Sequence, residues 1–286
     1  MWRMILWVLG ALFALAAITV GIVAYQGAQR PTNTPQYVAL GSSYSAGIGL
    51  GEPIPGAPLM CATGLDGYPQ QLARRTGMSI VDRSCSGATT AHVLTGRQYF
   101  QPAQLDFIDQ RTELVTLTIG GNDLFYVGDL MLLAAAKDQS FGGWLARRAA
   151  RTPPPASARD IDGVRTHIKD IILEARRRAP RARIIVVTYP VILPPQGTCE
   201  KAGLTAEEVA IMREVGARLA QATREAVAET DATLIDFEAP SAGHDVCAPE
   251  PWVNGWRDAV GAQFHPTLAG ATAAAQALEA QLESVQ

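Results

Sequence analysis

The sequence has few charged residues and no excess of either sign. Charged residues make up 18% of the 286 positions, whereas hydrophobic residues make up 48%, and no heptad or longer repeat is visible. This composition excludes an intrinsically disordered chain and a coiled coil. The 24 Lys and Arg residues against 27 Asp and Glu give a net charge of -3, which lacks the basic excess of a nucleic-acid-binding protein. We therefore expect a globular protein with no nucleic-acid partner.

Formal charge is absent from a long stretch near the N-terminus, residues 4–25. As a helix, this stretch covers roughly 33 Å, enough to cross a hydrocarbon core of about 30 Å. Gln-Gly-Ala at 26–28 matches a signal-peptidase site poorly, so we favour an uncleaved anchor over a cleaved signal peptide; a buried core helix is the third alternative. The positively charged N-terminal end of this stretch favours export of the rest of the chain. The predicted organisation is an anchor or signal segment and linker at 1–30, followed by one domain at 31–286.

Cysteine is also scarce, with four residues and no C-x-x-C pair, so neither zinc nor another metal is predicted. An even number in an exported chain favours two disulfides, with reduced core cysteines as the alternative. Three pairings are possible. The smallest loops result from joining Cys61 to Cys85 and Cys199 to Cys247.

Short apolar runs rich in β-branched residues alternate along the chain with segments of helical spacing. The expected strands are 37–40, 79–81, 114–119, 183–189 and 233–237. The expected helices are 68–76, 161–179, 206–229 and 267–282, the third opened by a capping box of Thr205 and Glu208. This alternation predicts a single α/β domain of three layers, in which helices flank a mostly parallel sheet.

Residues 134–159 do not fit this alternation. They contain an amphipathic basic segment at 141–151, followed by three prolines at 153–155 that must interrupt any helix. A solvated surface insertion is the favoured interpretation, and a lid or membrane-facing flap near the active site is the alternative.

Ligands of parallel α/β sheets bind at the carboxyl ends of the strands, so the residues that follow each strand are the first candidates for a site. The first strand is followed by Gly-Ser-Ser-Tyr at 41–44, the second by Ser-Cys-Ser-Gly at 84–87 and the third by Gly-Gly-Asn-Asp at 120–123. A histidine precedes the last helix, in Phe-His-Pro-Thr at 264–267. Of the four histidines, His265 is the best candidate for a base, ahead of His92, His167 and His244.

Taken together, these blocks resemble the SGNH subclass of the GDSL esterase and lipase family. The resemblance covers the chain from about Tyr37 to the last helix. It is closest to the exported actinobacterial branch, which carries Cys-Ser-Gly-Ala-Thr-Thr, present here at 85–90, and Pro-Trp-Val-Asn-Gly, present at 251–255. It implies the flavodoxin-like SGNH hydrolase fold and no cofactor. The G-x-S-x-G elbow of α/β-hydrolases is absent around Ser43.

The resemblance also implies the role of each block. Ser43 is the expected nucleophile and His265 its general base. The oxyanion is expected to meet the backbone N–H groups of Ser43 and Gly87 and the side-chain amide of Asn122.

Two positions depart from the family pattern. Ser42 occupies the place of the family's Asp, which is not the nucleophile, so the role of Ser43 is unaffected. Ala262 occupies the place of the Asp that usually lies three residues before the histidine. We expect the Ala262 carbonyl to orient His265 instead, with Asp258 as the competing carboxylate.

The predicted function is therefore a serine ester hydrolase, an esterase or lipase of the cell envelope, that cleaves acyl or acetyl esters. Its expected substrate is a small acyl ester, a lipid or an acylated glycan. It is expected to be a monomer, either held on the membrane by the N-terminal helix or secreted after cleavage. The alternatives are an acyltransferase that uses an envelope sugar or lipid hydroxyl, and a catalytically inactive envelope-binding protein.

Overall fold

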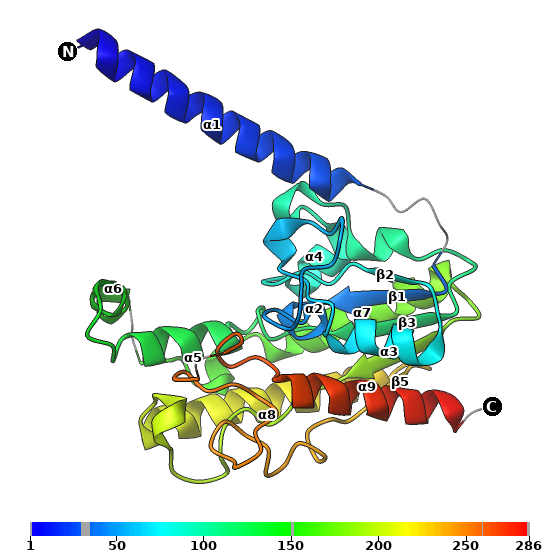
Figure 1. Cartoon of the computed structure of the whole chain (residues 1–286). Helices are drawn as coiled ribbons and strands as arrows, with labels where there is room; N and C mark the ends of the chain where they lie inside the picture. Colours follow the sequence, from blue (N-terminus) through cyan, green and yellow to red (C-terminus); the bar gives the residue numbers. More distant parts are fainter. Residues whose placement is uncertain (1, 30–34, 150–151, 259, 285–286) are drawn as a thin grey trace.

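The computed structural model describes residues 2–29, 35–149, 152–258 and 260–284. The apolar N-terminal segment forms helix α1 (Trp2–Ala28), which projects from the body of the molecule (Figure 1). Its stretch Met4–Gly27 has a mean hydropathy of 2.5 and is long and apolar enough to cross a membrane. Most of the expected linker, and with it the predicted domain boundary at 30/31, lies outside the described residues.

The body is built on a parallel sheet with the strand order β2-β1-β3-β4-β5. The strands are β1 (Tyr37–Gly41), β2 (Ile80–Asp82), β3 (Leu114–Thr118), β4 (Arg183–Val187) and β5 (Thr233–Ile235). All five were predicted, but β4 and β5 end two residues earlier than expected, because the Phe237 N–H donates to the hydroxyl of Thr188 rather than to a strand carbonyl. The chain adds β2 on one side of β1 and then β3, β4 and β5 on the other side. Parallel α/β sheets bind ligands at such a switch point, beside β1.

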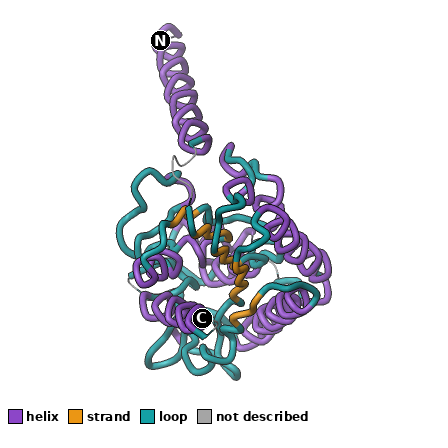
Figure 2. The backbone as a smooth tube through the Cα atoms, turned by 90° about the vertical axis from the view of Figure 1, so that its right-hand side faces the viewer, coloured by secondary structure: helices purple, strands orange, loops and turns teal. Residues whose placement is uncertain are grey.

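Helices cover both faces of the sheet, as Figure 2 shows. One face packs against α3 (Tyr68–Thr76) and α9 (Leu268–Glu283), and the other against α4 (Thr90–Thr95), α7 (Ile161–Arg178) and α8 (Ala206–Ala228). Alternate residues of β1 point to opposite faces, so Tyr37 and Ala39 join the first core, whereas Val38 and Leu40 join the second. The predicted three-layer α/β domain is confirmed.

The described residues also form helices in the connections between these elements. They are α2 (Ser43–Ala46), α5 (Tyr126–Ala135), α6 (Phe141–Ala149) and the short helices η1 (Leu59–Cys61), η2 (Gln98–Phe100), η3 (Gln104–Phe107), η4 (Ala156–Ala158) and η5 (Glu200–Ala202). The basic segment 141–151 is therefore mostly helical, and its last two residues lie outside the described part of the chain.

Both predicted disulfides are present: Cys61 is bonded to Cys85, and Cys199 to Cys247. The first joins η1 to the loop after β2, whose Ser86 N–H donates to the Cys61 carbonyl at 3.0 Å. The described residues contain no cluster of His, Cys, Asp or Glu side chains that could hold a metal ion.

Candidate active site

The turn after β1 brings Ser43 to the carboxyl edge of the sheet. Gly41 has a φ of +135°, and a Cβ there would lie 2.3 Å from the Thr118 carbonyl oxygen, so no larger residue fits. The next residue, Ser42, donates its N–H to the same carbonyl at 3.0 Å. Ser43 then opens helix α2 and is 7% exposed.

Gln104, from η3, fixes the end of β1 through both atoms of its side-chain amide. Its Oε1 accepts the Gly41 N–H at 2.8 Å, and its Nε2 donates to the Gly41 carbonyl at 3.0 Å. The residue before the Ser-Ser pair is thus held by a buried side chain from another part of the chain.

His265 faces Ser43 across 222 positions of sequence, with Nε2 2.8 Å from the serine Oγ. Its other ring nitrogen, Nδ1, lies 2.7 Å from the Gln263 carbonyl oxygen. Because a carbonyl can only accept, Nδ1 carries the proton and Nε2 presents its lone pair to the Ser43 hydroxyl. The other three histidines, His92, His167 and His244, have other hydrogen-bond partners.

The acceptor for His265 differs from the predicted one. The Ala262 carbonyl accepts the backbone N–H of His265 at 3.2 Å and the Asn254 side-chain amide at 3.2 Å. Asp258 accepts the Gly255 N–H at 2.7 Å and lies 3.9 Å from the Lys201 ammonium. The group beside Nδ1 is a main-chain carbonyl, as expected, but it belongs to Gln263.

A left-handed residue between Gln263 and His265 accounts for this shift. Phe264 is fully buried and has a φ of +57°, a costly conformation for an aromatic residue. It is held there because its N–H donates to the Asn254 carbonyl at 2.9 Å and its own carbonyl accepts the Tyr44 hydroxyl. The Asn254 N–H in turn donates to the His265 carbonyl at 2.9 Å. The Pro-Trp-Val-Asn-Gly motif therefore pairs with the histidine segment.

Gly87 and Asn122 lie on the loops after β2 and β3, which a hydrogen bond joins. Gly87 has a φ of +82°, which favours glycine, and lies on the exposed turn after the Cys61–Cys85 disulfide. Asn122, on the loop after β3, donates from Nδ2 to the Ala88 carbonyl at 2.8 Å. This bond joins the two loops, and the second N–H of the amide is available to a ligand.

Burial sets the protonation of the groups around Ser43. It lowers the pKa of His265, while the hydrogen bond to Gln263 opposes that shift, so the imidazole is neutral near neutral pH. Burial raises the pKa of Tyr189 to about 12 and that of Tyr44 well above its ordinary value, so both keep their protons. The Tyr189 hydroxyl lies 2.9 Å from the Ser42 Oγ and 3.3 Å from the Gly121 nitrogen. It links the loops after β1 and β3.

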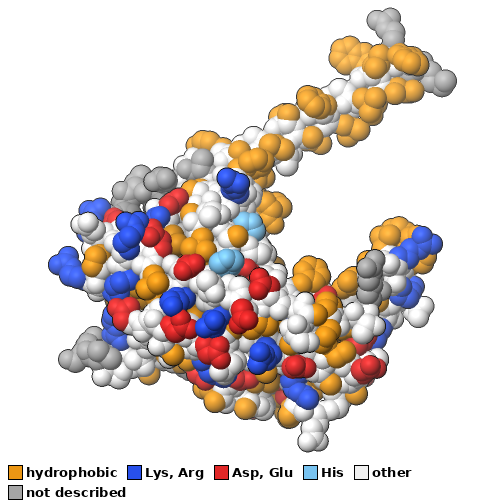
Figure 3. Space-filling view, turned by 180° about the vertical axis from the view of Figure 1, so that it is seen from behind, with side chains coloured by type: hydrophobic (Ala, Val, Ile, Leu, Met, Phe, Trp, Pro, Cys, Tyr) orange, Lys and Arg blue, Asp and Glu red, His pale blue; other side chains and the backbone are white. Residues whose placement is uncertain are grey.

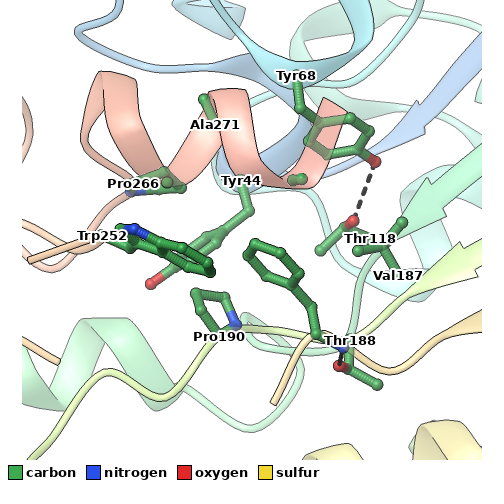
Figure 4. Close-up of a pocket in the computed structure, with 12 residues that line it drawn as sticks. Tyr44, Tyr68, Thr118, Val187, Thr188, Pro190, Trp252, Pro266 and Ala271 are labelled. Carbon is green, nitrogen blue, oxygen red and sulfur yellow. Dashed lines mark hydrogen bonds between the residues drawn. The ribbon is translucent and has the colours of Figure 1, made fainter. Parts of the chain in front are cut away.

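A small cavity lies behind Tyr44, between α9 and the ends of β3 and β4 (Figure 4). The side chains of Tyr68, Trp252 and Pro190 border it, and its volume of about 20 Å³ holds no more than a water molecule.

Comparisons with known proteins show which family the chain belongs to. Residues 39–273 match the GDSL-like lipase/acylhydrolase family. Lipase 2 of Streptomyces coelicolor is 34% identical over 242 residues, which cover 82% of this chain and 81% of that protein. The lipase of Streptomyces rimosus is 29% identical over 263 residues, covering 90% of this chain and 92% of that protein.

Two solved structures share the fold over nearly their whole length. Phospholipase A1 from Streptomyces albidoflavus superposes with a TM-score of 0.69 at 26% identity, covering 85% of this chain and 98% of that chain. The extracellular lipase from Streptomyces rimosus gives 0.68 at 27% identity, with the same coverage of 85% and 98%. The chain therefore belongs to the GDSL-like lipase/acylhydrolase family and is a carboxylic ester hydrolase.

Proposed function

We propose that this chain hydrolyses acyl esters through an acyl-enzyme on Ser43, with His265 as general base. The observation that carries the proposal is the 2.8 Å contact between the Ser43 Oγ and the Nε2 atom of His265. The other ring nitrogen, Nδ1, is hydrogen-bonded to the Gln263 carbonyl. This tautomer leaves Nε2 free to take the serine proton as the hydroxyl attacks. Nε2 then returns the proton to the leaving alcohol, and a water molecule repeats the sequence to release the acid.

The negative charge on the substrate oxygen is met by three donors. Ser43 is the first residue of α2, so its backbone N–H has no acceptor within the helix. The N–H of Gly87 and the second N–H of the Asn122 amide complete the set. Because the Ala88 bond fixes the amide of Asn122, this donor is held in place before the substrate arrives. Loss of one such donor costs about 3 to 4 kcal/mol of transition-state stabilisation.

The proposed location is the outer face of the cytoplasmic membrane, where α1 anchors the enzyme. The length and hydropathy of Met4–Gly27 suit a membrane span, and residues 4–22 are exposed. The two disulfides suit an oxidising compartment outside the cytoplasm. N-terminal sequencing of the mature protein tests this location, because a terminus near Gln29 would mean cleavage and release.

Labelling with a fluorophosphonate probe tests the mechanism, since only an activated serine reacts. We expect the wild-type protein to label on Ser43, and Ser43→Ala to remain unlabelled. An ester series of increasing acyl length, with the free acid quantified, then measures hydrolysis and chain-length preference. Absence of labelling in a folded wild-type protein would refute the mechanism and favour a binding role. Transfer of the acyl group to an added glycan or lipid hydroxyl, without free acid, would identify an acyltransferase.

A further inference from the structure

The last turn of α1 is seated against the body beside η1 and η2. A Cβ on Gly27 would lie 2.9 Å from the Tyr99 carbonyl oxygen, so only a glycine allows this close approach. The neighbouring Gln26 accepts the Leu59 N–H through its side-chain oxygen at 3.3 Å. The point where α1 leaves the body is therefore defined by contacts with η1 and η2.

This contact surface lies next to the turn that carries Gly87, on the proposed oxyanion side of the active site. Gln98, the first residue of η2, donates from Nε2 to the Ser86 carbonyl at 2.8 Å. The same nitrogen would lie 3.6 Å from a Cβ on Gly87. Only one short segment thus separates the base of α1 from the Gly87 turn.

Apolar side chains are exposed on both rims of this region. Leu59 is 70% exposed and Phe100 is 63% exposed beside α1, and Phe125 is 57% exposed three residues after Asn122. Both phenylalanines have left-handed backbones, with φ of +63° and +54°. A left-handed backbone costs free energy, and exposure of a phenylalanine side chain to water does not offset that cost. Contact with an apolar partner would offset it.

Helix α6 presents a second apolar surface. Gly143 and Ala146 are buried, whereas Phe141 is 75%, Trp144 41% and Leu145 49% exposed. The guanidinium of Arg148 lies 4.2 Å from the centre of the Trp144 ring. Exposed aromatic and leucine side chains next to arginine are typical of helices that lie in the headgroup region of a bilayer.

The two apolar surfaces border the same hollow. Figure 3 shows the molecule hollowed between α1 and α6, with hydrophobic and basic side chains gathered on α6. In Figure 1, β1 points toward the side on which α1 and α6 project, and Ser43 follows β1 directly. The carboxyl edge of the sheet therefore faces this hollow.

We infer that α6 and the exposed side chains of Leu59, Phe100 and Phe125 dock on the surface of the bilayer that α1 enters. The mouth of the active site then faces the membrane, and the enzyme takes its ester from the lipid phase. The bilayer is the expected partner because the surface continues from the base of a membrane-spanning helix and because Arg148 complements anionic headgroups. The choice of substrate rests on the proposed reaction, and the docking rests on the proposed anchoring by α1.

The docking is tested by measuring how deeply a single fluorescent label lies in the bilayer. The four native cysteines are paired in disulfides, so one introduced cysteine accepts a fluorophore specifically. Leu145→Cys is the test position, and Leu173→Cys, on α7, is the matched control because these leucines are 49% and 47% exposed. In full-length protein reconstituted in vesicles of phosphatidylethanolamine and phosphatidylglycerol, a nitroxide-labelled lipid should quench the label at 145 and not at 173. Equal quenching at both positions would overturn the docking.

An activity measurement separates docking from catalysis. The triple change Phe141→Ser, Trp144→Ser and Leu145→Ser should slow hydrolysis of a diacyl lipid in vesicles about tenfold or more, because the helix loses its apolar contact with the bilayer. The rate on a water-soluble short-chain ester should stay unchanged, and Leu173→Ser should affect neither substrate. Equal losses on both substrates would contradict the inference. If the wild type cleaves neither ester, the proposed function fails, and the quenching result alone decides the docking.

Discussion

The Nδ1 atom of His265 donates to the main-chain carbonyl of Gln263 at 2.7 Å. A carbonyl fixes the ring and its tautomer as a carboxylate would, but it offers only a partial negative charge to the imidazolium that forms during acylation. The imidazole of His265 is therefore held by backbone geometry rather than by a side chain that mutation can remove.

This contact predicts a small effect for Asp258→Asn. Asp258 accepts the Gly255 N–H and does not contact the imidazole, so kcat should fall less than about tenfold, a cost under roughly 1.4 kcal/mol. Steady-state kinetics on a short-chain ester measures the change, with circular dichroism to confirm folding. A thousandfold loss in a folded protein would instead assign Asp258 a direct part in catalysis.

The pH dependence of kcat/KM should report the burial of His265. Burial lowers its pKa below the ordinary value of about 6.5, and the active form is the neutral imidazole. As the pH falls, activity should be lost only when it passes this lowered pKa, so the acid limb should lie below pH 6.5. Initial rates measured over a range of pH in buffers of constant ionic strength check this. A midpoint above 6.5 would contradict the predicted direction.

Ser43→Ala should abolish hydrolysis while leaving the fold intact. The hydroxyl contacts His265, and its loss removes the nucleophile without opening a cavity of more than one oxygen atom. A reduction of at least about a thousandfold in kcat is expected. Thermal unfolding within a few degrees of wild type serves as the control. Substantial residual turnover by the folded variant would exclude Ser43 as the nucleophile.

Tyr44→Phe tests a positioning residue that the sequence did not reveal. The change removes the hydroxyl that donates to the Phe264 carbonyl but keeps the ring that lies 5.3 Å from the His265 ring. Loss of a buried hydrogen bond should cost about 1 to 3 kcal/mol of stability, and kcat should fall with little change in KM. Denaturant titration and kinetics measure the two effects. Unchanged kcat would mean that the histidine loop holds its shape without this bond.

The disulfides should stabilise the fold rather than take part in catalysis. Replacing Cys199 and Cys247 by alanine opens a link between positions 48 residues apart and should cost about 4 kcal/mol on the chain-entropy model. Urea titration measures the loss, and activity per folded molecule should stay near wild type. Peptide mapping without reductant should recover the 61–85 and 199–247 linkages, and free thiols at these positions would disprove the pairing.

The fold was largely predictable because a parallel sheet buried on both faces requires continuous apolar strands. Helix 68–76 was predicted with the bounds that the structure shows, and the capping box of Thr205 and Glu208 marks the true start of α8. The strand ends were less predictable. Whether the Phe237 N–H bonds to a strand carbonyl or to the Thr188 hydroxyl depends on how the chain curls after the sheet, which apolar periodicity does not record.

In the site, Ser43 and His265 come together as predicted, but the contacts that position them were not visible in the sequence. The left-handed backbone of Phe264 turns the Gln263 carbonyl toward the imidazole, and nothing in a phenylalanine indicates a positive φ. The Tyr44 hydroxyl reaches a carbonyl 220 positions away, a pairing that only tertiary structure creates. The family blocks identify the chemistry, whereas these long-range contacts set its geometry.

Gln104 acts as a substitute for a missing peptide group. Strand β2 ends where Asp82 pairs with Ala39, yet β1 continues for two more residues to Gly41. The side-chain oxygen of Gln104 supplies the acceptor for the Gly41 N–H, and the Gly41 carbonyl accepts both the Gln104 Nε2 at 3.0 Å and the Cys85 N–H at 3.1 Å. Beyond β2 the chain still donates to β1 from the N–H groups of Arg83 and Cys85 before it reaches the turn at Gly87. A single side chain from another helix thus completes the hydrogen bonding of the strand that leads to Ser43.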